Sequence, residues 1–242
     1  MRDYANETTS RVAFIKEAVA KAGVTGIVFG NSGGKDSALA GILCKLACDN
    51  TVGVSMPCGS KANYGSDLSD AKALATQFNI DLRVVDLAAV QGVLIETVGA
   101  HTQFAQMAIA NIAPRLRMTT LYAIANSENR LVVGTDNRSE MYMGYFTKWG
   151  DGAYDINPVG DLTVTEVYEF LAYLGAPESI ISKAPSAGLF EGQTDEKEMG
   201  VTYSSIDKYL AGGEVSPDDK EIIERFHRTS EHKRKMPPVY NG

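Results

Sequence analysis

The chain has 242 residues and a formal net charge of −7. Its length suffices for one domain with its own hydrophobic core, so we expect a single domain over residues 1–242. The acidic balance argues against general binders of nucleic acid or of membrane surfaces, and no apolar stretch reaches membrane-spanning length. The odd number of cysteines, three, and the lack of a recognisable signal peptide favour a reducing cytoplasm over a disulfide framework.

Short apolar runs alternate with helical patterns along the first half of the chain. The runs at 24–29, 51–56 and 81–87 precede helical patterns at 36–48, 66–78 and 90–98, respectively. A longer helical pattern then ends near Asn129, and RLVVGT at 130–135 predicts a fourth buried strand. This alternation is typical of right-handed βαβ units, so we expect an α/β fold, a three-layer sandwich around a parallel sheet.

The pattern changes after the fourth predicted strand. Residues 136–160 are rich in Gly, Tyr, Asp and Asn without clear periodicity, which indicates a functional loop region. An amphipathic helix is predicted over 163–175, with Thr163 as its N-cap and Gly175 as its stop. Helical patterns at 203–211 and 217–229 then precede the basic run HKRK.

The stretch GNSGGKDS, residues 30–37, joins the first predicted strand to the helix after it. Backbone N–H groups converge at a helix N-terminus, and glycines let the backbone touch phosphate oxygens, so this junction predicts an anion site. It matches neither the P-loop GxxxxGK[ST] nor GxGxxG, because Lys35 is followed by Asp36. A carboxylate facing a polyphosphate needs an intervening cation, and Asp36 is therefore interpreted as a Mg²⁺ ligand. The alternative is that Asp36 caps the helix and the glycines merely make a turn.

The stretch SGGKDS resembles the pyrophosphate loop SGGxDS of the ATP pyrophosphatase superfamily, whose members adenylate a carbonyl oxygen and release pyrophosphate. Six further blocks resemble the ammonia-dependent NAD synthetase family, in the same order along the chain. They are NIAPRLRM (111–118), VVGTDNRSE (132–140), GYFTKWGDGAYDINPVGDL (144–162), KAPSAGL (183–189), GQTDEKEMGVTYSSID (192–207) and HKR (232–234).

The resemblance implies an adenine nucleotide alpha hydrolase-like fold and the amidation of nicotinic acid adenine dinucleotide (deamido-NAD) by ammonia. The reaction would use ATP, pass through an acyl-adenylate, and give NAD, AMP and pyrophosphate. No covalent nucleophile is implied, because positioning and charge neutralisation suffice for this chemistry. The family also implies a homodimer in which the segment 101–127 supplies apolar contacts. Four side chains there could serve either as core or as interface: Ile109, Ile112, Leu116 and Leu121.

The resemblance also implies roles for individual residues. The loop that would bind the ATP phosphates consists of Gly30, Asn31, Ser32, Gly33, Gly34, Lys35, Asp36 and Ser37. Two further ATP contacts would come from Thr135 and Ser186, and Mg²⁺ would be held by Asp36 and Glu140. The residues at positions that bind deamido-NAD are Arg115, Lys148, Asp155, His232 and Lys233.

One position departs from the family pattern. Most members carry a lysine at the helix start after GDL, where this chain has Val164. The missing cation predicts weaker ATP binding, unless Lys35 compensates for it. Cys58 is the only cysteine in a predicted loop, and no histidine segment pairs with it, so we expect free ammonia rather than glutamine as the nitrogen source.

Two other functions remain open at this stage. Another ATP pyrophosphatase, such as a tRNA-thiolating enzyme, is disfavoured by the lack of a CxxC pair and of a basic surface balance. A nucleotide-binding protein without catalysis is disfavoured by the presence of Asp36 and Glu140. Taken alone, Arg115 or Lys148 would be interpreted as a solvated surface charge.

Overall fold

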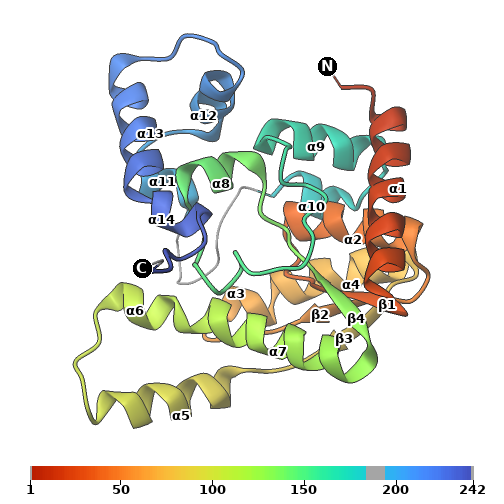
Figure 1. Ribbon diagram of the computed structural model, residues 1–242, viewed down its shortest axis with the longest axis horizontal. Helices are drawn as coiled ribbons and strands as arrows, with labels where there is room; N and C mark the ends of the chain where they lie inside the picture. The colour runs from red at the N-terminus through yellow and green to blue at the C-terminus, as the bar shows by residue number, and fades with distance from the viewer. Residues whose placement is uncertain (1, 184–193, 241–242) are drawn as a thin grey trace.

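A computed structural model describes residues 2–183 and 194–240 (Figure 1). Within these residues the chain forms a four-stranded, fully parallel sheet with the strand order β3-β2-β1-β4. The strands are β1 (Gly26–Gly30), β2 (Thr51–Ser55), β3 (Asp81–Val84) and β4 (Arg130–Val133). β2 is buried along its whole length, as the continuous apolar runs predict for parallel strands covered on both faces.

Helices cover both faces of the sheet (Figure 1). On one face α2 (Lys35–Ala47) and α4 (Ser66–Phe78) pack on the strands, and three helices share their hydrophobic core: α1 (Tyr4–Ala22), α9 (Val164–Tyr173) and α10 (Glu178–Ile181). On the other face α7 (Ile112–Glu128) packs on β1 and β4. The predicted α/β fold with a parallel sheet between two helical layers is therefore confirmed.

Within the described part of the chain, six further helices lie near the loops that follow the strands. They are α3 (Lys61–Tyr64), α8 (Arg138–Met143), α11 (Asp195–Met199), α12 (Tyr203–Leu210), α13 (Pro217–Thr229) and α14 (Glu231–Arg234). In Figure 1, α12, α13 and α14 gather at the upper left, next to α8 and α11. A second apolar cluster joins α8, α11, α12 and α13 to α9: Met143, Val164, Met199, Val201, Tyr203, Ile206 and Ile223.

The helix α8 lies inside the segment 136–160, for which the composition indicates a loop throughout, and that expectation is wrong over six residues. Asn137 caps the helix: its side chain accepts from the backbone N–H of Glu140, and the Glu140 carboxylate accepts from the N–H of Asn137. This capping box fixes the start of a helix that is too short to show a hydrophobic period.

The helix α5 (Ala88–Gly99) does not cover the sheet as a crossover helix usually does, and it has no buried residue. It lies along the outer side of α7, and α6 (Gln106–Ala110) connects the two (Figure 1). Large apolar side chains are exposed on these helices: Val90, Val93, Leu94, Met107 and Ile109. Of the four side chains that could be core or interface, Ile112 and Leu121 are core, Leu116 is partly buried and Ile109 is exposed.

Candidate active site

The connections of the adjacent strands β1 and β4 run on opposite faces of the sheet. β1 leads into α2 on one face, whereas β4 is reached from α7 on the other, so their carboxyl ends form a topological switch point. Ligands of open α/β sheets bind at such points. A cavity of about 750 Å³ opens there, and its wall includes the loops after β1 and β4 together with residues of α8, α9 and α14.

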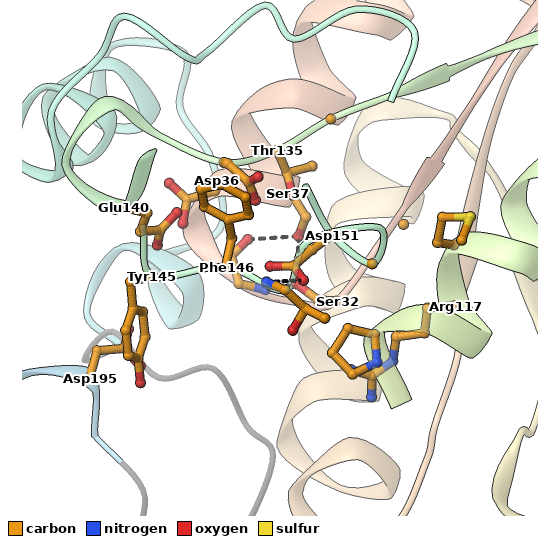
Figure 2. Close-up of a pocket in the computed structure, with 18 of the residues that line it drawn as sticks. Ser32, Asp36, Ser37, Arg117, Thr135, Glu140, Tyr145, Phe146, Asp151 and Asp195 are labelled. Atoms are coloured by element: carbon orange, nitrogen blue, oxygen red, sulfur yellow. Dashed lines mark hydrogen bonds between the residues drawn. The ribbon is translucent and has the colours of Figure 1, made fainter. Parts of the chain in front are cut away.

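The loop after β1 is held by its own side chains. Asn31 is fully buried and donates to the carbonyl oxygen of Ala71 (3.1 Å), and the hydroxyls of Ser32 and Ser37 share a hydrogen bond of 3.0 Å (Figure 2). Gly33 has a φ of 76°, and a Cβ at this position would lie 2.1 Å from the carbonyl oxygen of Asp67. Only glycine fits this conformation and this close approach.

The N-terminus of α2 opens toward the cavity. Its N-cap is Gly34, which has no side chain to bond the first backbone N–H groups of the helix. Asp36 lies inside the first turn instead, and its carboxylate bonds other side chains, so it is not the cap. Uncapped N–H groups at a helix N-terminus favour an anionic ligand, and phosphate is the anion that this geometry commonly binds.

Two carboxylates meet beside that helix end. Asp36 accepts from Asn137 Nδ2 (3.0 Å) and from Lys35 Nζ (2.6 Å), and Glu140 Oε1 lies 3.6 Å from the same Nζ. Burial and the neighbouring charge of Asp36 raise the pKa of Glu140 to about 8, and the Lys35 ammonium opposes this shift. The sequence spacing alone does not show that Asp36 and Glu140 are close. In the folded chain Asn137 links them, because its side chain donates to Asp36 and accepts from the backbone N–H of Glu140.

The pair suits a hard divalent cation. The Lys35 ammonium marks a position at which both carboxylates already meet one positive charge. Over residues 2–183 and 194–240, no group of three or more His, Cys, Asp or Glu side chains could hold a metal ion. Mg²⁺ commonly binds through only one or two carboxylates, with waters and substrate phosphates as its other ligands, so two carboxylates next to a phosphate site are sufficient.

Two further acids in the cavity wall have no sequence motif that singles them out. Asp136 follows Thr135 in the loop after β4, and Asp151 accepts from the backbone N–H of Thr147 (3.0 Å). Desolvation raises the pKa of both carboxyls, and the charges of Asp151 and Glu140 raise that of Asp136 further. Asp136 is buried, whereas Asp151 is an exposed residue at the cavity wall. Both placements are tertiary properties, and only the position of the two residues in the Gly-rich and Asp-rich segment 136–160 hints at them.

Basic side chains lie at other parts of the wall. Lys233 donates to the carbonyl oxygens of Gly144 and Phe146 (both 2.8 Å), and burial lowers its pKa. Arg117, which sequence reasoning missed, donates to the carbonyl oxygen of Met56 (3.1 Å) and is largely buried, which lowers its pKa. Figure 2 shows Arg117 on the side of the cavity away from Asp36 and Glu140.

The remaining predicted residues fall into two groups. Arg115 donates to the carbonyl oxygen of Lys148 (3.3 Å), and Lys148 Nζ donates to that of His232 (2.5 Å), so α7, the loop and α14 converge there. None of these three lines the cavity. Asp155 also lies outside its lining: one carboxylate oxygen accepts from Tyr122 and the other from the backbone of β4. Ser186 is outside the described residues.

The chain is similar to known proteins over nearly its whole length. The family model described as NAD synthase matches residues 7–237. The NH3-dependent NAD+ synthetase of Carboxydothermus hydrogenoformans is 46% identical over 240 residues, which cover 98% of each chain.

Two solved structures are similar over 100% of both chains. They are the NMN synthetase of Francisella tularensis, with a TM-score of 0.94 and 38% identity, and the NH3-dependent NAD synthetase of Campylobacter jejuni, with 0.80 and 29%. The resemblance inferred from the loop and the six blocks is confirmed, and this chain belongs to the NAD synthase family.

Proposed function

We propose that this chain is a ligase that amidates deamido-NAD with ammonia and ATP, giving NAD, AMP and pyrophosphate. The observation that carries the proposal is the junction of β1 and β4, where an uncapped helix N-terminus lies beside Asp36 and Glu140. Family membership supports the same reaction. We take residues 1–242 as one synthetase domain, and the free thiols of Cys44, Cys48 and Cys58 support a cytoplasmic location.

The chemistry explains why such a site is needed. A carboxylate is a poor acyl donor, so the nicotinate carboxylate oxygen first attacks the α-phosphorus of ATP, and pyrophosphate leaves. Ammonia then attacks the acyl carbon of the adenylate, and the bond to AMP breaks. In our assignment the backbone of Gly30–Ser37 holds the phosphates, and Mg²⁺ bound by Asp36 and Glu140 would neutralise their charge.

The other assignments follow the family pattern. Thr135 lies in the cavity wall after β4, where it could contact ATP, and Ser186 is assigned to ATP as well. Lys233, within the wall, is assigned to deamido-NAD. The remaining residues assigned to the dinucleotide are Arg115, Lys148, Asp155 and His232. The hydrogen bonds that link Arg115, Lys148 and His232 support a joint role for these three residues outside the cavity lining.

Nicotinic acid mononucleotide is a second candidate for the acyl substrate. The chain superposes better on the NMN synthetase of Francisella tularensis, with a TM-score of 0.94, than on the NAD synthetase of Campylobacter jejuni, with 0.80. The activation and amidation steps are the same for both substrates. They differ in whether the protein must also bind the adenosine half of a dinucleotide.

The nitrogen source and the acyl substrate can be tested in one assay. With ammonium salts, MgATP and deamido-NAD, we expect NAD, AMP and pyrophosphate in equal amounts, at a rate that rises with pH as the NH₃ fraction increases. Glutamine should give little product, and Cys58→Ser should not change the rate, because Cys58 is buried, which raises its thiol pKa. Liquid chromatography of the products provides the measurement.

Two outcomes of this assay would contradict the proposal. Turnover of nicotinic acid mononucleotide but not of deamido-NAD, each with MgATP and ammonium salts, would establish the second candidate instead. Robust use of glutamine that Cys58→Ser eliminates would show that the chain generates its own ammonia.

We also propose a homodimer formed through the exposed apolar side chains of α5 and α6. In a monomer these helices would leave Val90, Val93 and Leu94 in water, and a second copy would cover them. Val93, 64% exposed, is the most accessible of the five. Val93→Asp should convert the dimer to a monomer in sedimentation velocity, because a carboxylate would be buried without a partner.

Leu46→Asp is the matched control, since Leu46 is also half-exposed but lies on α2. It should leave the sedimentation coefficient unchanged. A wild-type monomer at micromolar concentration would refute the dimer.

A further inference from the structure

Lys35 occupies an unusual place for a lysine. It is the first residue of α2, it is 7% exposed, and the residues that follow it from Ser37 to Cys44 are buried. Its Nζ lies between two carboxylates and two aromatic rings: 2.6 Å from Asp36, 3.6 Å from Glu140, 5.7 Å from the centroid of Tyr203 and 6.0 Å from that of Tyr168. Ring faces and carboxylates both attract an ammonium group.

The groups around this ammonium are held by other contacts. The Tyr203 hydroxyl donates to Asp195 (3.1 Å), the Tyr168 hydroxyl donates to the carbonyl oxygen of Lys183 (2.6 Å), and Asn137 bonds Asp36. Two carboxylates and two ring faces therefore surround the Lys35 ammonium, which is an environment that suits a positive charge.

No second lysine is available from the start of α9. Val164 is 4% exposed and packs in the apolar cluster that contains Tyr203 and Met143. Of the ion pairs found within the described residues, those of Asp36 and Glu140 both involve Lys35. The positive charge that meets these two carboxylates is thus supplied from the phosphate loop itself.

The ammonium and a divalent cation would compete for the same two carboxylates. Two cations a few ångströms apart in a buried site repel strongly, so Lys35 must leave when a metal ion binds. The lysine has a flexible four-carbon stem, and its own backbone belongs to the loop assigned to phosphate. Phosphates bound at this loop would be anions within its reach.

We propose that Lys35 is a displaceable counter-ion of the metal site, which neutralises Asp36 and Glu140 in the nucleotide-free protein and transfers to the phosphates when Mg²⁺ and ATP bind. The inference rests on the proposed assignment of these carboxylates to Mg²⁺. The displacement makes the binding of metal and nucleotide cooperative. The metal ion frees the ammonium from the carboxylates, and the phosphates hold the ammonium away from them. By linkage this coupling is reciprocal.

The test is binding of Mn²⁺, followed by electron paramagnetic resonance, and of α,β-methylene-ATP, followed by calorimetry. Without nucleotide, Lys35→Met should bind Mn²⁺ at least about tenfold more tightly than wild type, because the competing ammonium is gone. It should bind the analogue about tenfold more weakly, because the phosphates lose a charged donor. The factor by which each ligand increases the affinity for the other should be smaller in Lys35→Met than in wild type.

Lys45→Met is the matched control, since Lys45 is on the same helix but pairs with Asp49 at the surface (3.7 Å). It should change neither affinity nor the coupling. Asp36→Asn, introduced into the otherwise wild-type chain, tests the underlying assignment separately and should abolish Mn²⁺ binding. If it does, and Lys35→Met still binds Mn²⁺ no more tightly than wild type, the counter-ion proposal is wrong.

If Lys35→Met fails to fold, Lys35→Gln replaces it, because its neutral amide can still donate to Asp36. The same two affinity changes are expected for this variant. Unchanged Mn²⁺ affinity in Lys35→Gln would overturn the proposal in the same way.

Discussion

Asp36→Asn and Glu140→Gln should each reduce MgATP-dependent release of pyrophosphate by at least about 10²-fold. Each substitution removes one of the two negative charges that meet beside the N-terminus of α2, and an amide is a much weaker ligand for Mg²⁺ than a carboxylate. Both replacements keep the size of the side chain, so the cavity should retain its shape. A coupled assay for pyrophosphate with deamido-NAD and ammonium salts measures the loss.

The loss should be specific to these carboxylates. Asp49→Asn is a suitable control, because the Asp49 side chain lies just beyond the end of α2 and is fully exposed. It should keep wild-type turnover, and thermal unfolding should show that all three variants are folded. Wild-type turnover in Asp36→Asn or Glu140→Gln would remove that residue from the metal site.

Gly33→Ala should raise the KM for ATP at least about tenfold. The left-handed backbone at Gly33 costs an alanine about 1–2 kcal/mol, and the new methyl group would collide with the carbonyl oxygen of Asp67, 2.1 Å away. Either the loop or the start of α4 must move, and the loop carries the N–H groups assigned to the phosphates. Initial rates at varied ATP concentration measure the change.

The neighbouring Gly34→Ala provides a matched comparison. Gly34 has a φ of −94°, which any residue adopts, and a Cβ there would meet only the Ser32 hydroxyl at 3.3 Å. A small adjustment of that hydroxyl accommodates the methyl group, so we expect a much milder effect. Equal ATP affinities for Gly33→Ala and wild type would mean that the loop backbone does not bind the phosphates.

The elements with a strong periodic or apolar signal could be predicted from the sequence. Buried parallel strands are continuous apolar runs, as at Ile27–Phe29, and the helix caps at Thr163 and Asn129 follow known residue preferences. α8 could not be predicted, because six residues show no period and its signal is only the N-x-x-E pattern of its capping box. The exposure of α5 was also hidden, since an exposed apolar helix and a core helix show the same apolar pattern.

The site was predictable only in part for the same physical reason. Glycines and Asp36 in one short stretch indicate the phosphate loop directly. The positions of Asp136, Asp151 and Arg117 in the cavity wall depend on segments far apart in the sequence, which no local pattern reports. The contact of Lys35 with Glu140 is likewise a property of the folded chain: the sequence places this lysine with the phosphates, and the structure places its ammonium among the carboxylates.

The hydrogen bonds from Lys233 to Gly144 and Phe146 attach α14, near the end of the chain, to a loop that lines the cavity. The chain leaves the ribosome N-terminus first, so all four strands and the loop Gly30–Ser37 emerge before α14 does. Until α14 has emerged, the part of the cavity wall that Lys233 supplies is missing. We therefore expect a chain terminated before α14 to lack activity even if its sheet forms.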